Sequence, residues 1–140
     1  TVLCSVSGAA ISLYFILATY RIIADDLIGR LPICNVDGTE KRIVDTSFGR
    51  ILRIPNSIYG FLYYLGILIL TLGWWGQWSE QLLFMISTLS CIVVLFSIFL
   101  YFVLTKKLET TCPLCVTTHI INAVLFLIFI TRSILITTGG

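Results

Sequence analysis

Four long apolar stretches dominate this chain and limit what it can fold into. They cover residues 2–20, 57–75, 82–104 and 113–136. Each is close to the roughly 20 residues that a membrane-spanning helix needs, and the only charged residue in any of them is Arg132. Because backbone groups in lipid must be hydrogen-bonded within their own segment, helices are favoured over an open sheet. The sequence therefore predicts an all-α membrane protein, a four-helix transmembrane bundle.

The overall composition excludes a soluble globular domain. Hydrophobic residues make up 58% of the chain and charged residues only 11%, far from the balance of a water-soluble protein. The first apolar stretch lacks a basic start and is longer than the apolar part of a typical signal peptide, so we expect a retained helix. We expect one domain over residues 1–140, integral to the lipid bilayer, with no nucleic-acid partner.

One long polar segment, from Asp25 to Asn56, separates the first two apolar stretches. It holds five of the seven acidic residues and five of the nine basic residues. A short Trp-rich link joins the second and third stretches, and residues 105–111 join the third and fourth. With four spans, the long loop and the 105–111 link lie on one side of the membrane, and the Trp-rich link lies on the other with both termini.

The fourth apolar stretch opens with the motif CPLC, which contains Cys112 and Cys115. Thr111 is predicted to cap this helix, and Pro113 suits its first turn. A helix N-terminus stabilises a thiolate, and a spacing of three lets the two sulfurs close a disulfide. The motif therefore predicts a redox-active pair where a membrane helix meets water, on the side of the polar loop.

Other interpretations of these cysteines remain open. A C-x-x-C pair can be ordinary buried packing in a purely structural membrane protein. Cys112, Cys115 and His119 also share one helical face, and Cys34 of the loop could complete a Cys₃His metal site. Cys34 could instead form a mixed disulfide with either cysteine of the motif, or remain a free structural thiol. The two cysteines within the other apolar spans are expected to pack as small hydrophobic residues.

Three segments of the chain resemble one known family. NSIYGFLYYLGILIL (56–70) and CPLCVTTHIINAVLFL (112–127) resemble the vitamin K epoxide reductase family, and LCSVSGAAISLYFIL (3–17) is similar to its first helix. SFGRILRIPNSIYG is more similar to the microbial members. The resemblance implies a four-helix bundle around a quinone, beneath a loop with shuttle cysteines. It also implies an enzyme, a quinone-dependent thiol-disulfide oxidoreductase that supports disulfide formation in a microbe or recycles vitamin K in an animal.

The resemblance assigns roles to individual residues. Cys112 and Cys115 match the catalytic pair, with Cys115 nearest the quinone and Cys112 exchanging with the loop. Asn56 matches a side chain that hydrogen-bonds a quinone carbonyl, although an Asn here could simply cap a helix. Tyr59 and Tyr63 match positions that line the quinone pocket; taken without the family, they are packing or interface aromatics.

Two positions depart from the family pattern. His119 stands where the family has a tyrosine that donates a hydrogen bond to the substrate; a histidine can also donate, and can deliver a proton, or can be a packed histidine. Lys41 stands where the family has a second loop cysteine, so only Cys34 remains. Either a thioredoxin-like protein acts directly on the CPLC pair, or Cys34 works alone through a mixed disulfide, or the chain is a divergent paralogue with other partners.

The two indicators of membrane orientation conflict. Eight of the nine basic residues lie on or near the cysteine side, and the positive-inside tendency would place that side in the cytoplasm. Disulfide chemistry belongs to extracytoplasmic compartments, and the resemblance implies an extracytoplasmic active-site face, in the cell membrane of a microbe or the ER membrane of a eukaryote. The 140 residues hold no thioredoxin domain, so we expect a separate thioredoxin-like partner, with a menaquinone, ubiquinone or vitamin K type quinone as electron acceptor.

Overall fold

The computed structural model describes residues 1–20, 50–51, 53–73, 78–107 and 112–139. Its long elements are α1 (Val2–Thr19), α3 (Asn56–Gly73), α4 (Glu80–Lys106) and α5 (Pro113–Gly139). All four helices are long and apolar enough to cross a membrane. The prediction of an all-α membrane protein with four spanning helices is therefore confirmed.

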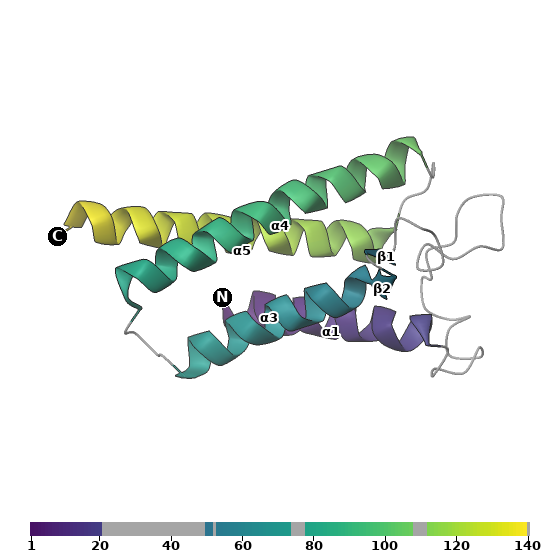
Figure 1. Ribbon diagram of the computed structural model, residues 1–140, viewed down its shortest axis with the longest axis horizontal. Helices are drawn as coiled ribbons and strands as arrows, with labels where there is room; N and C mark the ends of the chain where they lie inside the picture. Colours follow the sequence, from purple (N-terminus) through teal and green to yellow (C-terminus); the bar gives the residue numbers. More distant parts are fainter. Residues whose placement is uncertain (21–49, 52, 74–77, 108–111, 140) are drawn as a thin grey trace.

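The helices run in alternating directions and pack as two pairs, α1 with α3 and α4 with α5, while α1 also touches α5 (Figure 1). One end of the bundle, here called the cysteine end, holds the last residues of α1 and α4 and the first residues of α3 and α5. It is the right-hand side of Figure 1. The opposite end, the distal end, holds the first residues of α1 and α4. This alternation agrees with the topology expected for four consecutive spans.

Small residues let α1 and α3 approach each other closely. A Cβ atom added at Gly8 would lie 2.6 Å from ring carbons of Tyr64, and one added at Gly60 would lie 3.1 Å from the Ser12 hydroxyl oxygen. Ser12 is itself buried. Membrane helices commonly pack through small residues, because lipid supplies no hydrophobic force that pushes helices together. This contact places the Tyr64 ring inside the bundle.

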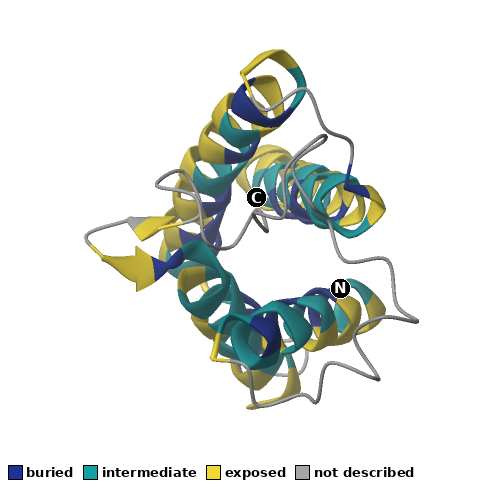
Figure 2. Cartoon of the chain, turned by 90° about the vertical axis from the view of Figure 1, so that its right-hand side faces the viewer, coloured by how far each residue is buried: buried dark blue, intermediate teal, exposed yellow. Residues whose placement is uncertain are grey.

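The interior core joins α3, α4 and α5, and α1 packs against it. Its buried residues are Tyr64, Ile67, Leu83, Ile86, Ile121, Leu125 and Phe129. The outward faces carry large exposed apolar side chains such as Leu62, Phe84 and Leu127, and Figure 2 shows the buried positions turned toward the middle of the bundle. Apolar side chains on the outside are expected where lipid is the solvent.

A small hairpin leads the chain into α3 at the cysteine end. Strands β1 (Arg50–Ile51) and β2 (Ile54–Pro55) pair antiparallel, with Arg50 opposite Pro55. Arg53, in the connecting turn, has a φ of 70°, in the left-handed region that non-glycine residues rarely adopt. The sequence predicts only a long polar segment here, because two-residue strands are too short to show an alternating pattern.

Candidate functional site

Cys112 is the residue directly before α5, and it is fully buried. It packs with Leu104 of α4, and Phe15 of α1 lies against the same cluster. Its carbonyl oxygen accepts a hydrogen bond from the Val116 amide at 3.0 Å, and its Sγ accepts one from the Cys115 amide at 3.4 Å. A side chain that accepts from the third helical amide is a helix cap. Cys112 thus takes the capping position that the sequence analysis gave to Thr111.

The two cysteines of the CPLC motif are in different chemical states. The Cys112 sulfur is in a disulfide bond, whereas Cys115 carries a free thiol. A Cys112–Cys115 disulfide is therefore not formed in this structure. Cys4 and Cys91 also carry free thiols, and neither is fully buried. The third predicted catalytic cysteine, Cys34, and the departure at Lys41 lie outside the described residues.

His119 lies one helical turn after Cys115 on α5. Its ring packs edge-on against Tyr101 of α4, with ring centroids 6.3 Å apart and an interplanar angle of 85°. The Nδ1 atom of His119 is buried and has no hydrogen-bond partner among the described residues. Buried polar atoms are almost always hydrogen-bonded in folded proteins. His119 therefore has a ring nitrogen available for a ligand.

The three predicted quinone-binding residues of α3 lie at different depths and have different surroundings. Asn56 is the first residue of α3 and is half-buried at the cysteine end. Tyr59 is 39% exposed, on the outer surface. Tyr63 lies one turn deeper, and its hydroxyl shares a 2.8 Å hydrogen bond with Ser90 of α4. Positions 56, 59 and 63 are spaced for one helical face, yet Tyr63 ties α3 to α4 while Tyr59 faces outward.

Two polar side chains near the cysteine end were missed by the sequence analysis. The Tyr14 hydroxyl of α1 and the Ser57 hydroxyl of α3 are buried with no hydrogen-bond partner within the described ranges. Both lie within about two helical turns of the cysteine end, as does His119. Three helices thus bring unsatisfied polar atoms to the same half of the bundle. Ser and Tyr are common in membrane helices, so the sequence alone did not single these two out.

A buried hydrogen-bond network lies just below this region. The Tyr64 hydroxyl donates to Asn122 Oδ1 at 2.6 Å, and Asn122 Nδ2 donates to Ser97 Oγ at 2.7 Å. The Tyr64 oxygen is also 3.5 Å from the carbonyl oxygen of Thr118. The network joins α3, α4 and α5 beneath Cys115. The signal for it was Asn122, an amide within an apolar span, where polar residues usually have a structural or functional role.

The described residues do not support the metal-site alternative. No three His, Cys, Asp or Glu side chains among them are placed to hold a metal ion. Cys112, Cys115 and His119 were the described members of the Cys₃His site considered from the sequence. The disulfide at Cys112 also removes the thiolate that would bind zinc.

A comparison with known protein families agrees with the site and the fold. The model of the vitamin K epoxide reductase family matches residues 1–130, which include all of α1, α3 and α4 and most of α5. This confirms the resemblance carried by the NSIYG and CPLC segments. Enzymes of that family are oxidoreductases that link thiol-disulfide exchange to a quinone. The chain therefore belongs to the vitamin K epoxide reductase family, as a multi-pass integral membrane protein.

Proposed function

We propose that this protein passes two electrons from the thiols of a thioredoxin-like protein, through Cys112 and Cys115, to a membrane quinone. The observation that carries the proposal is the difference between the two cysteines. Cys112 is bonded, buried and directly before the first residue of α5, whereas Cys115 is a free thiol in the first turn of that helix. Such a difference is expected halfway through disulfide exchange, when one sulfur of a pair is bonded elsewhere.

The first half of the cycle reduces the quinone. The reduced Cys112 and Cys115 thiols together give up two electrons and two protons, and a disulfide bond forms between them. The quinone takes up both electrons and both protons and becomes a quinol. Cys115 acts next to the quinone, because it lies deeper in the bundle and has His119 one turn beyond it on α5.

The second half restores the thiols. The Cys34 thiolate attacks the Cys112 sulfur, which forms a Cys34–Cys112 disulfide and releases the Cys115 thiol. A thiolate of the partner protein then attacks Cys34 and releases the Cys112 thiol, and the second thiol of the partner resolves that mixed disulfide. The partner leaves oxidised. Cys34 is assigned this role because Cys4, Cys91 and Cys115 all carry free thiols while Cys112 is bonded.

We place the quinone near the cysteine end, with Asn56 and His119 as donors to its carbonyl oxygens and Tyr59 and Tyr63 as aromatic neighbours. The buried Nδ1 of His119 and the buried hydroxyl of Ser57 support this placement, because both lack a partner among the described residues. A quinone carbonyl would satisfy a donor there. The cysteine end would face an extracytoplasmic compartment, where disulfides persist.

The test is quinone reduction by the purified protein in lipid vesicles, with a reduced thioredoxin-like protein or a small dithiol as donor. Cys115→Ala should lower the rate to background with both donors. Cys91→Ala, which removes another free thiol in α4, should leave the rate unchanged. Cys34→Ala should lower the rate with the protein donor more than with the small dithiol. Cys112 is buried, so a protein donor needs the relay cysteine more than a small thiol does.

Two results would contradict the proposal. One is quinone reduction that persists in Cys115→Ala at the rate of the unmodified protein. The other is an unmodified protein that reduces no quinone and contains stoichiometric zinc by elemental analysis, which would favour a metal-binding or non-catalytic relative.

A further inference from the structure

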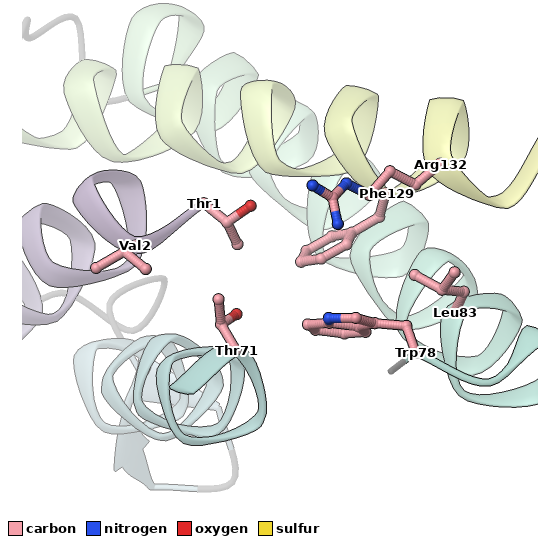
Figure 3. Close-up of a pocket in the computed structure, with 7 residues that line it drawn as sticks. All are labelled: Thr1, Val2, Thr71, Trp78, Leu83, Phe129 and Arg132. Carbon is pink, nitrogen blue, oxygen red and sulfur yellow. The ribbon is translucent and has the colours of Figure 1, made fainter. Parts of the chain in front are cut away.

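A cavity lies at the distal end of the bundle, far from the cysteines. Its volume is about 290 Å³, and it is lined by residues near the starts of α1 and α4, near the end of α3 and in the second half of α5 (Figure 3): Thr1, Val2, Thr71, Trp78, Leu83, Phe129 and Arg132. Arg132 follows Cys115 by 17 residues on α5, or about 25 Å along a helix. The cavity is therefore separate from the proposed redox site.

Arg132 gives this cavity a positive charge that no described acidic side chain neutralises. Within the described ranges it forms no ion pair or hydrogen bond, and Glu80 is the only acidic residue there. The Glu80 carboxylate instead accepts a hydrogen bond from the Thr137 hydroxyl at 3.4 Å. Arg132 is exposed, and long basic side chains near the end of a spanning helix extend toward the membrane interface. An exposed guanidinium with no protein partner at that level can pair with an anion from outside the chain.

The depth of Arg132 in the membrane matches that of a lipid headgroup. Arg132 follows Pro113, the first residue of α5, by 19 residues, or about 28 Å, close to the roughly 30 Å of the hydrocarbon core. When the cysteine end lies at one membrane surface, Arg132 lies at the other. Trp78, which also lines the cavity, is of a residue type enriched at that level.

The walls of the cavity combine one charged corner with an apolar floor. Figure 3 shows the Arg132 guanidinium above the ring of Phe129, with the Trp78 indole on the other side of that ring. The Trp78 and Phe129 rings lie 6.0 Å apart, and Phe129 and Leu83 are almost fully buried. A guanidinium and an indole N–H both donate to phosphate oxygens, and the apolar floor suits an acyl chain.

We propose that this cavity binds an anionic glycerophospholipid from the leaflet opposite the cysteine end. The lipid phosphate pairs with Arg132 and accepts a hydrogen bond from the Trp78 indole, and the first part of an acyl chain packs against Phe129 and Leu83. Basic pockets between membrane helices bind anionic lipid headgroups in this way.

Native mass spectrometry of the purified full chain tests the lipid site. The protein is released from detergent after incubation with equal amounts of phosphatidylglycerol and phosphatidylcholine that carry the same acyl chains. We expect the unmodified protein to retain phosphatidylglycerol preferentially. Arg132→Gln should lower the retained phosphatidylglycerol about tenfold, the value of one charge-assisted hydrogen bond. Lys106→Gln removes an exposed positive charge at the cysteine end and should leave retention unchanged.

A second variant tests the cavity independently of the charge. Thr71→Phe places an aromatic ring in the cavity from α3 and keeps Arg132, so it should also lower retention. Circular dichroism and quinone reduction, measured on the same samples, identify which of the two variants is folded. Only the retention of a folded variant is compared with that of the unmodified protein.

Four outcomes overturn the proposal. Two concern the lipids and the charge: equal retention of the two lipids, and unchanged phosphatidylglycerol retention in a folded Arg132→Gln variant. The third is a loss in Lys106→Gln as large as that in Arg132→Gln, and the fourth, in a parallel incubation with inorganic phosphate, is retention of phosphate in place of lipid. The last outcome would identify a site for free phosphate.

Discussion

The close contact between Gly8 and Tyr64 predicts a large effect from adding one methyl group. In Gly8→Ala the new Cβ would lie 2.6 Å from the Tyr64 ring, whereas ordinary contacts begin at 3.4 Å. The ring must therefore move by 0.8 Å, the difference between these two distances. Tyr64 is only 1% exposed, and its hydroxyl is held by Asn122 at 2.6 Å, so the ring cannot swing out of the bundle.

The expected loss of stability combines two effects. Overpacking of this kind costs about 1 to 3 kcal/mol, and weakening one hydrogen bond between membrane helices costs about 0.6 kcal/mol. Replacing glycine by alanine also stabilises a helix by about 0.5 to 1 kcal/mol. This gain opposes the loss, and it is the same in a control variant that has no clash. Gly66→Ala is the matched control, since a Cβ there meets nothing within 4 Å. Gly8→Ala should thus be about 2 to 3 kcal/mol less stable than Gly66→Ala.

The assay is unfolding by a denaturing detergent in mixed micelles, followed by circular dichroism. A Tyr64→Leu background should relieve the clash, so the cost of Gly8→Ala there should fall by at least about 1 kcal/mol in a double-mutant cycle. Equal stability of Gly8→Ala and Gly66→Ala would refute the reasoning, and so would a cost of Gly8→Ala that is unchanged in the Tyr64→Leu background.

Three further predictions concern α5 and its cap. His119→Tyr should retain quinone reduction, because it keeps a donor, whereas His119→Phe should lower the rate about tenfold through loss of a hydrogen bond. Asn122→Leu removes the hydrogen bonds to Tyr64 and Ser97 and should lower the free energy of unfolding in detergent by about 1 kcal/mol. In protein purified without reductant and then denatured, mass mapping after alkylation should find Cys115 labelled and Cys112 protected until a reductant is added.

The helices of this protein could be predicted from the sequence because lipid imposes one requirement on every span. The spans 82–104 and 113–136 were recognised, although α4 begins at Glu80 and ends at Lys106 and α5 continues to Gly139. A search for apolar residues stops at charged or polar ones, whereas a helix continues until its backbone is capped. Ser79 provides that cap for α4 by accepting from the Leu82 amide at 3.3 Å.

The candidate site was only partly predictable, because a sequence does not tell which helix faces meet. The CPLC pair and its place at the start of α5 followed from the motif. The hydrogen bonds from Tyr63 to Ser90 of α4 and from Tyr64 to Asn122 of α5 depend on the rotation of α3 about its axis. Gly8 of α1 leaves the space that the Tyr64 ring occupies at that rotation. The hairpin before α3 was missed because its strands are too short to leave a pattern.

The cap formed by Cys112 means that reactivity and local folding depend on one atom. Its sulfur accepts a hydrogen bond from the Cys115 amide and also takes part in the disulfide. An alanine at this position would remove both, at a cost to the helix start of about 1 kcal/mol. A serine would keep an acceptor for the Cys115 amide and remove only the chemistry. Poor yield of an alanine variant would therefore indicate that the start of α5 has unfolded locally. The serine variant is the better inactive control, because it removes the thiol and keeps the helix cap.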